Sequence, residues 1–206
     1  MSRELANFGD NAIASVTRGA GSGETFGMEG RYDVTCYDVD GNLKWTDYAD
    51  NLVTAEGKQL MFDSFLKGSA YTVVGPFLGL TKVSLTPLQN DTLTTLVTTN
   101  SGEFTNYTCD QTGTAVRGTL AFGSASNGGQ ASPGNVVTSA ATGITFTITS
   151  TGGTVYGCFV ATGTGAVSTQ SNVSGKLYSE GNFSGGSKVV TAGDKLTVTY
   201  STTATS

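Results

Sequence analysis

Few residues in this sequence could act as nucleophiles or as metal ligands. Three cysteines are present, Cys36, Cys109 and Cys158, and the chain contains no histidine. Without histidine, neither a Ser-His-Asp triad nor a Cys-His pair can form. The usual nitrogen ligand of zinc and non-haem iron sites is missing as well. We therefore expect no catalytic residue, no bound metal and no cofactor.

The spacing of the cysteines argues against a disulfide framework. Their number is odd, no two of them form a Cys-x-x-Cys pair, and Cys158 lies in the apolar run VYGCFV. In a reducing compartment disulfides are rare, and a free cysteine behaves as a small apolar residue of the interior. The sequence therefore predicts buried free thiols.

Paired carboxylates are the remaining route to acid–base chemistry, because hydrolysis of a glycosidic bond needs only two of them. Carboxylates on hairpins are commonly solvated surface groups. We adopt that interpretation and keep a carbohydrate-cleaving enzyme as the less favoured one. The acidic residues in question surround one predicted hairpin: Asp33, Asp38, Asp40, Asp47 and Asp50.

The stretch DVDGN within this hairpin, from Asp38 to Asn42, also resembles the start of a calcium-binding loop. The twelfth position of such a loop normally supplies a bidentate glutamate, and here that position is Ala49. Asp-Gly and Gly-Asn pairs tolerate the positive φ angles of a tight hairpin turn. The stretch therefore predicts a turn rather than a calcium site.

Composition and charge disfavour two classes of partner. The 206 residues include 11 basic and 16 acidic side chains, for a net charge of -5, and the lysines are scattered singly. Binding to duplex DNA needs a basic face that neutralises phosphates. No apolar run approaches the roughly 18 to 20 residues that span a bilayer, and the opening MSRELANFGDN lacks the apolar centre of a secretion signal. We expect neither nucleic acid nor a membrane as partner.

Short alternating segments dominate most of the chain and predict strands. In GITFTITST the apolar Ile144, Phe146 and Ile148 alternate with threonines, and TVYGCFVAT is apolar on both faces, as in a central strand. The segment LQNDTLTTLVTTNSGEF is predicted to be a loop with one weak strand. About eight to ten strands with turn signals between them, and no alternating helices, predict an all-β fold.

The specific architecture we predict is an antiparallel two-sheet sandwich, jelly-roll-like, with one short helix and an extended N-terminal arm. An immunoglobulin-like sandwich is the alternative. Trp45 comes too early in the sequence for the Cys-Trp-Cys framework of that fold, which makes the jelly-roll-like sandwich the favoured prediction.

One amphipathic helix is predicted within residues 50–72. Thr54 can cap its start. Met61, Phe65 and Leu66 recur at helical spacing, so we expect them in the protein's own core. Phe65→Ala would then cost about 3 to 5 kcal/mol. The alternative is that this helix face packs on a second copy of the chain.

Residues 1–29 are predicted to form an extended, glycine-rich arm, followed by a β-sandwich domain over residues 30–206. The arm has no sustained hydrophobic period, so it cannot bury enough apolar surface by itself to offset its ordering entropy. Its larger apolar side chains and its arginines are the types that anchor interfaces. These candidate contact residues are Arg3, Leu5, Phe8, Ile13, Arg18 and Phe26.

Two parts of the sequence resemble small virion proteins of tailed bacteriophages. The first is YDVDGNLKWTDYADNLVTAEGKQLMFDSFLKGSAYTVVGPFLGL. The second comprises TFTITSTGGTVYGCFVATG and LYSEGNFSGGSKVVTAGDKLTVTY. Together they cover about residues 31–200, with a divergent middle. The shared motifs are structural rather than catalytic.

This resemblance implies a capsid decoration (cement) protein. Such a protein would bind the major capsid protein on the capsid exterior, as a dimer or trimer, after synthesis in the cytoplasm of the host bacterium. The arm residues would be the capsid contacts, and an acidic module fits the outer face better than the DNA-filled interior. The alternative is a tail or fibre-associated β-sandwich module that binds host-surface carbohydrate, which tyrosines and Trp45 clustered on one exposed face would favour.

Overall fold

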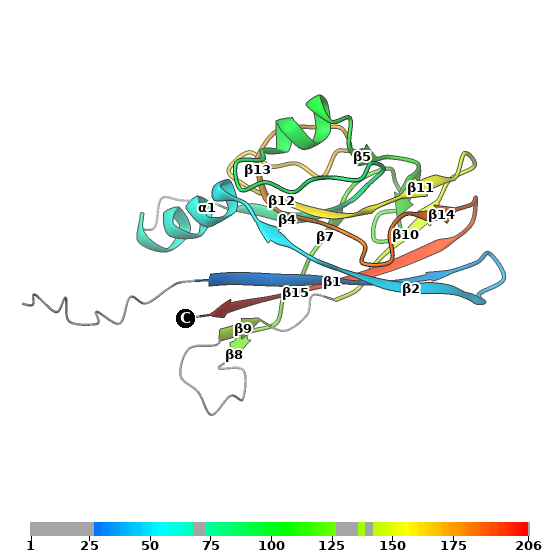
Figure 1. Ribbon diagram of the computed structural model, residues 1–206, viewed down its shortest axis with the longest axis horizontal. Coiled ribbons are helices and arrows are strands. Elements are labelled where there is room, and N and C mark those ends of the chain that lie inside the picture. The colour runs from blue at the N-terminus through cyan, green and yellow to red at the C-terminus, as the bar shows by residue number, and fades with distance from the viewer. Residues whose placement is uncertain (1–26, 68–72, 127–135, 139–141, 206) are drawn as a thin grey trace, which may run out of the picture.

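The computed structural model of this chain describes residues 27–67, 73–126, 136–138 and 142–205. Within these ranges the chain forms two large antiparallel sheets packed face to face (Figure 1). The all-β two-sheet sandwich predicted from the alternating segments is therefore confirmed.

The larger sheet has seven strands, of which five follow the order β2-β1-β15-β10-β6, while β9 pairs with β15 and β8 pairs with β9. The first and last strands of the chain pair over their whole length, with Gly27 opposite Thr205 and Tyr37 opposite Lys195. The strands of this sheet are β1 (Gly27–Tyr37), β2 (Leu43–Asp50), β6 (Tyr107–Cys109), β8 (Ala125–Ser126), β9 (Val136–Thr138), β10 (Ile144–Ile148) and β15 (Lys195–Thr205).

The smaller sheet has six strands, in the order β3-β13-β12-β4-β5 with β7 paired to β4. The remaining elements of the described ranges are two helices and a two-stranded ribbon of β11 and β14. The bounds are β3 (Leu52–Val53), α1 (Ala55–Leu66), β4 (Val74–Thr81), η1 (Thr95–Thr99), β5 (Glu103–Phe104), β7 (Gly118–Thr119), β11 (Gly153–Val155), β12 (Gly157–Gly163), β13 (Lys176–Asn182) and β14 (Lys188–Val190).

The main core lies between the two sheets and follows the predicted alternation. Ile144, Phe146 and Ile148 of β10 are at most 2% exposed, and every residue of β12 is buried. The rings of Tyr32 and Tyr200, which lie opposite each other in the larger sheet, stack at 4.6 Å between centroids. The Tyr32 hydroxyl joins the two sheets, because it lies 2.6 Å from the Ser179 hydroxyl of β13. Strands with one buried face hold their register firmly, since a slip of one residue would turn the apolar face outward.

A second, smaller core forms where residues 82–102 cover the other face of the six-stranded sheet. The predicted segment, residues 88–104, contains one short strand, β5, as expected, but the rest is not a plain loop, because it includes the π-helix η1. Leu93 and Leu96 are both 1% exposed, and their three-residue spacing puts them on one helical face. The Thr92 hydroxyl accepts a hydrogen bond from the Thr95 N–H at 3.1 Å and so caps this helical turn.

A buried ion pair lies at the edge of this second core. Arg117 and Glu103 are 1% and 3% exposed, and their side chains form two parallel hydrogen bonds of 2.8 and 2.7 Å. Arg117 also donates to the carbonyl of Asn172 at 2.8 Å, and the N–H of Ser171 donates to Glu103 at 2.8 Å. The pair thereby ties a long loop to the outer face of the sheet.

The predicted hairpin turn at DVDGN is confirmed. The Asp38 side chain accepts hydrogen bonds from the backbone N–H groups of Asp40 and Asn42 at 2.9 and 2.8 Å, and Gly41 adopts a φ of 85°. A hydrogen bond from the Asn42 side chain, with these backbone N–H groups, lowers the pKa of Asp38. The carboxylate therefore serves the turn itself.

The sandwich begins slightly earlier than the sequence indicated. Gly27, Met28 and Glu29 belong to β1 and pair with β15, whereas the predicted arm extended to residue 29. A deletion of the predicted arm that spares the sheet must therefore stop before Gly27.

Candidate functional site

The three cysteines are free and buried, as predicted. Burial raises the pKa of the Cys36 thiol to about 12, and it raises the pKa values of Cys109 and Cys158 as well. A thiol reacts as its thiolate, so all three sites disfavour the reactive form. They act as small apolar residues of the core.

Three of the five carboxylates around the first hairpin, those of Asp33, Asp38 and Asp47, are engaged in structural contacts. Asp47 lies 2.7 Å from the Lys188 ammonium. Burial would raise the pKa of Asp47, but hydrogen bonds from Lys188 and from the backbone N–H groups of Tyr48 and Gly185 outweigh it, and the pKa is lowered. Asp33 pairs with Arg31 at 2.8 Å. Among the described residues, no group of three or more histidine, cysteine or acidic side chains could hold a metal ion.

One buried carboxyl group was missed by the sequence analysis. Glu180 of β13 is 1% exposed, and its Oε1 atom has no hydrogen-bond partner in the described part of the chain. Burial, together with a hydrogen bond to Asp91 and the charge of that residue, raises the pKa of Glu180 to about 8. A perturbed carboxyl can mark an active site, but residues 82–102 cover Glu180, so we interpret this pair as part of the second core.

Helix α1 sits against β13 through its first turn. The Thr54 side chain caps the helix by accepting the N–H of Gly57 at 3.1 Å, as predicted, and donates to the carbonyl of Leu177 in β13. A Cβ atom at Gly57 would collide with the backbone carbonyl of Tyr178. Glycine is therefore needed at this position for the close approach of helix and strand, which offsets its poor helix propensity.

Gly57→Ala is expected to lower the free energy of unfolding by about 1 to 2 kcal/mol, although alanine gains roughly 1 kcal/mol of helix propensity. The added methyl group has to push the helix away from the carbonyl of Tyr178. Equilibrium unfolding in urea measures the change. Gln59→Ala, at an exposed position of the same helix, serves as the control with little effect, and a Gly57→Ala protein as stable as the wild type would contradict the close contact.

The prediction that Met61, Phe65 and Leu66 lie in the protein's own core was wrong for most of this set. Phe65 and Leu66 are 87% and 70% exposed, and Met61 is only partly buried. The face that meets β13 is centred on Gly57 and Leu60 instead. Phe65→Ala is therefore a surface change, and its expected cost falls below about 0.5 kcal/mol.

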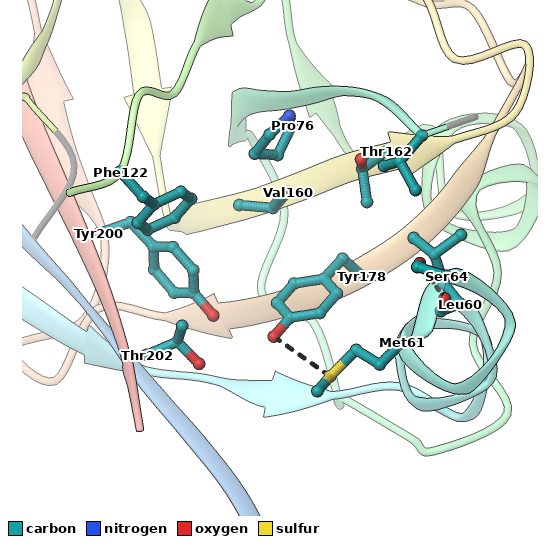
Figure 2. A pocket seen from close by; sticks show the side chains of 11 residues that line it. Leu60, Met61, Ser64, Pro76, Phe122, Val160, Thr162, Tyr178, Tyr200 and Thr202 are labelled. Carbon is teal, nitrogen blue, oxygen red and sulfur yellow. Dashed lines mark hydrogen bonds between the residues drawn. The ribbon is translucent and has the colours of Figure 1, made fainter. Parts of the chain in front are cut away.

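A pocket of about 220 Å³ opens between α1 and the ends of both sheets. We call it the helix-end pocket. Figure 2 shows Tyr200 and Thr202 of β15 on one side, with Val160 and Tyr178 of the six-stranded sheet and α1 around the rest. The Tyr178 hydroxyl donates to the sulfur atom of Met61 at 3.9 Å. The full lining is Leu60, Met61, Ser64, Val73, Pro76, Phe122, Val160, Thr162, Tyr178, Tyr200 and Thr202.

The side chains of this pocket can bind but have little capacity for chemistry. Its lining contains no acidic, basic or cysteine side chain. Burial raises the pKa of Tyr178 and that of Tyr200, so both phenols stay protonated and act as weak hydrogen-bonding groups. An apolar side chain or a small apolar molecule is the occupant that such a lining favours.

Several of the aromatic residues considered for a glycan-binding face are buried or half-buried in the described ranges. Trp45 is half-buried, with its ring 5.9 Å from that of Phe183, and its indole N–H has no partner among the described residues. Tyr32, Tyr107 and Tyr200 are at most 1% exposed. The exposed large aromatic side chains in the described ranges include two on α1, Phe62 and Phe65.

The predicted contact residues of the arm all lie outside the residues that the structure describes. They are Arg3, Leu5, Phe8, Ile13, Arg18 and Phe26. Their role in binding stays a prediction.

The fold and its sites define an all-β sandwich with an apolar pocket at one end. Comparisons with protein-family models, with curated proteins and with solved structures found no match to this chain. No helix in the described ranges has both the length and the apolar character needed to cross a membrane. The function therefore has to be argued from the chain itself.

Proposed function

We propose that this chain is a structural virion protein that binds the outer surface of a bacteriophage capsid and stabilises it. The resemblance of about residues 31–200 to tailed-phage virion proteins supplies the class. The partner is the major capsid protein, bound by copies of this chain that associate as a dimer or trimer on the particle. Absence of catalytic activity stays part of the proposal.

The proposal rests mainly on three chain segments that lie together at one end of the sandwich and could contact a larger surface. The start of β1, the end of β15 and helix α1 lie together there (Figure 1). Three large apolar side chains of α1, those of Phe62, Phe65 and Leu66, are exposed, and twenty-six residues precede β1. A sandwich with its contact groups at one end is suited to sitting on a larger surface, because it can add contacts there without altering its core.

The arrangement of the reactive groups also supports a structural role. The cysteines are buried, and the aspartates of the first hairpin are used in a turn and in ion pairs. The net charge of -5 favours a position away from packaged DNA. Each of these features fits a module whose task is contact rather than catalysis.

Deleting residues 1–26 is expected to leave the sandwich folded and to reduce occupancy on capsids. The deletion stops before Gly27, so all pairs between β1 and β15 are kept. Full-length and shortened proteins are mixed with bare capsids of the phage that encodes the chain. Bound protein is quantified after sedimentation, and capsid rupture on heating is compared. Arm residues that order on binding contribute contacts at a cost in entropy, so affinity should fall rather than vanish.

The control for this experiment is Val39→Ser, because Val39 is 73% exposed in the hairpin between β1 and β2, away from the proposed contact end. This variant should bind as the full-length protein does. Equal occupancy of the shortened and full-length proteins would show that the arm does not contribute to capsid binding. If neither protein bound, the proposed capsid function would be wrong.

A further inference from the structure

Helix α1 and its surroundings expose more apolar surface than a solvated helix needs. Phe65 and Leu66 are 87% and 70% exposed, and Val73 and Val74 are 40% and 38% exposed. Met61 joins these groups, because it lines the helix-end pocket together with Val73 and lies one helical turn before Phe65. We call these five residues the α1 patch. A contiguous apolar patch on a soluble protein marks a contact surface.

Strand β1 begins next to this patch. Figure 1 shows α1 extending away from the sheets at the end where β1 starts. The connection that leads from β2 to α1 is tied to β1, because Asn51 donates its backbone N–H to the carbonyl of Gly30 at 3.0 Å. Thr202, which lies opposite Gly30 in the sheet, lines the helix-end pocket. The chain therefore enters the sheet within a few residues of the pocket.

Strand alternation decides which side chains of β1 point between the two sheets. The Tyr32 hydroxyl lies 2.6 Å from the Ser179 hydroxyl of β13, so Tyr32 points inward. Because alternate residues share a face, Gly30 and Met28 point the same way. The residue two positions before Met28 is Phe26. Phe26 is thus the nearest large apolar residue before β1.

We propose that the residues preceding β1 dock on the α1 patch of their own chain, with Phe26 as the anchor. Phe26 directly precedes Gly27, the first residue of β1, so the two Cα atoms are about 3.8 Å apart. This tether gives the segment an effective concentration on the order of millimolar toward the patch. A second copy at micromolar concentration therefore competes poorly for the same surface. The docking covers apolar surface in the free protein and does not depend on the capsid role.

The test uses a pair of introduced cysteines, Phe26→Cys with Phe65→Cys. The native thiols do not interfere, because all three are buried and have raised pKa values. Protein at low micromolar concentration is placed in a glutathione redox buffer. Disulfide formation over time is followed by mass spectrometry and by gel electrophoresis without reductant. A disulfide requires Cα atoms within about 7 Å, so it reports docking directly.

The matched control is Phe26→Cys with Lys67→Cys. Lys67 is exposed and adjacent to Leu66 in sequence, but it lies about 200° around the helix axis from Phe65. Phe26→Cys with Leu66→Cys is a second test pair, in case the change at Phe65 disturbs folding. Thermal unfolding of each reduced variant verifies that the sandwich is intact.

The expected result is an intrachain disulfide in at least one test pair, formed at least about tenfold faster than in the control pair. Equal rates in test and control pairs would overturn the proposal, because they would show a segment that samples all sides of the helix. Disulfide-linked dimers as the main product would overturn it in favour of a second copy as occupant. Failure of both test pairs to form a disulfide in folded protein would also overturn it.

Discussion

Arg117→Met is expected to lower the free energy of unfolding by about 3 to 5 kcal/mol. The guanidinium of Arg117 is enclosed and makes two short hydrogen bonds to Glu103. Its removal leaves the carboxylate of Glu103 buried, with the N–H of Ser171 as its remaining partner among the described residues. Equilibrium unfolding in guanidinium chloride, followed by circular dichroism, measures the loss.

Two further variants make this prediction specific to the buried charge. Arg117→Met combined with Glu103→Leu is expected to recover most of the lost stability, because a buried ion pair is worth little more than well-packed apolar residues in its place. Arg31→Met is the control, since Arg31 and its partner Asp33 are 47% and 54% exposed, and the expected loss is much smaller because solvent screens this pair. Similar losses for Arg117→Met and Arg31→Met would contradict the prediction.

Glu180→Gln is expected to stabilise the protein at pH 8 and to leave it nearly unchanged near pH 4.5. Folding raises the pKa of Glu180 from 4.5 to about 8. Between these values the folded state holds a proton that the unfolded state has released. The contribution of Glu180 to stability is therefore fully present below pH 4.5, is lost as the pH rises toward 8, and changes no further above it. The whole loss corresponds to roughly 3 to 5 kcal/mol.

Glutamine removes this loss because it carries no charge and its amide can still donate to the Asp91 carboxylate. The free energy of unfolding in urea is measured at several pH values for the wild type and the variant. The difference between the two curves is the contribution of Glu180. Asp47→Asn supplies a control of opposite sign, because the pKa of Asp47 is lowered by folding, so its contribution is present at neutral pH and is lost as the pH falls. The same pH dependence in wild type and Glu180→Gln would refute the assignment.

The fold class could be predicted because strand alternation is a local property. Ile144, Phe146 and Ile148 face the core in the structure as the sequence indicated, since side chains of a strand alternate between its faces. Turn residues such as those around Gly41 carry equally local information. The covering segment with η1 could not be predicted in this way, because its helical turn depends on Leu93 and Leu96 packing on a distant sheet.

The interpretation of α1 shows a different limit. The sequence placed apolar residues on two adjoining sides of the helix, and periodicity alone does not say which side meets the sheet. The choice depends on Gly57, which permits contact with the Tyr178 carbonyl, whereas from sequence alone a glycine inside a helix indicates only lower helix stability. The buried pairs of Glu103 with Arg117 and of Asp91 with Glu180 were also invisible in the sequence, because their members come together only through the fold.

The pairing of β1 with β15 has a consequence for how the protein is made. β15 lies between β1 and β10 in the larger sheet. One edge of β1 therefore stays unpaired until β15, which is about 170 residues away in the chain, has been synthesised. During synthesis on the ribosome β1 and β2 can form a hairpin, but the sheet cannot close until Thr205 has emerged. Chains dominated by such distant pairings fold slowly. Until then the nascent chain exposes one apolar face of that hairpin, and a chaperone that holds it would improve the yield of folded protein.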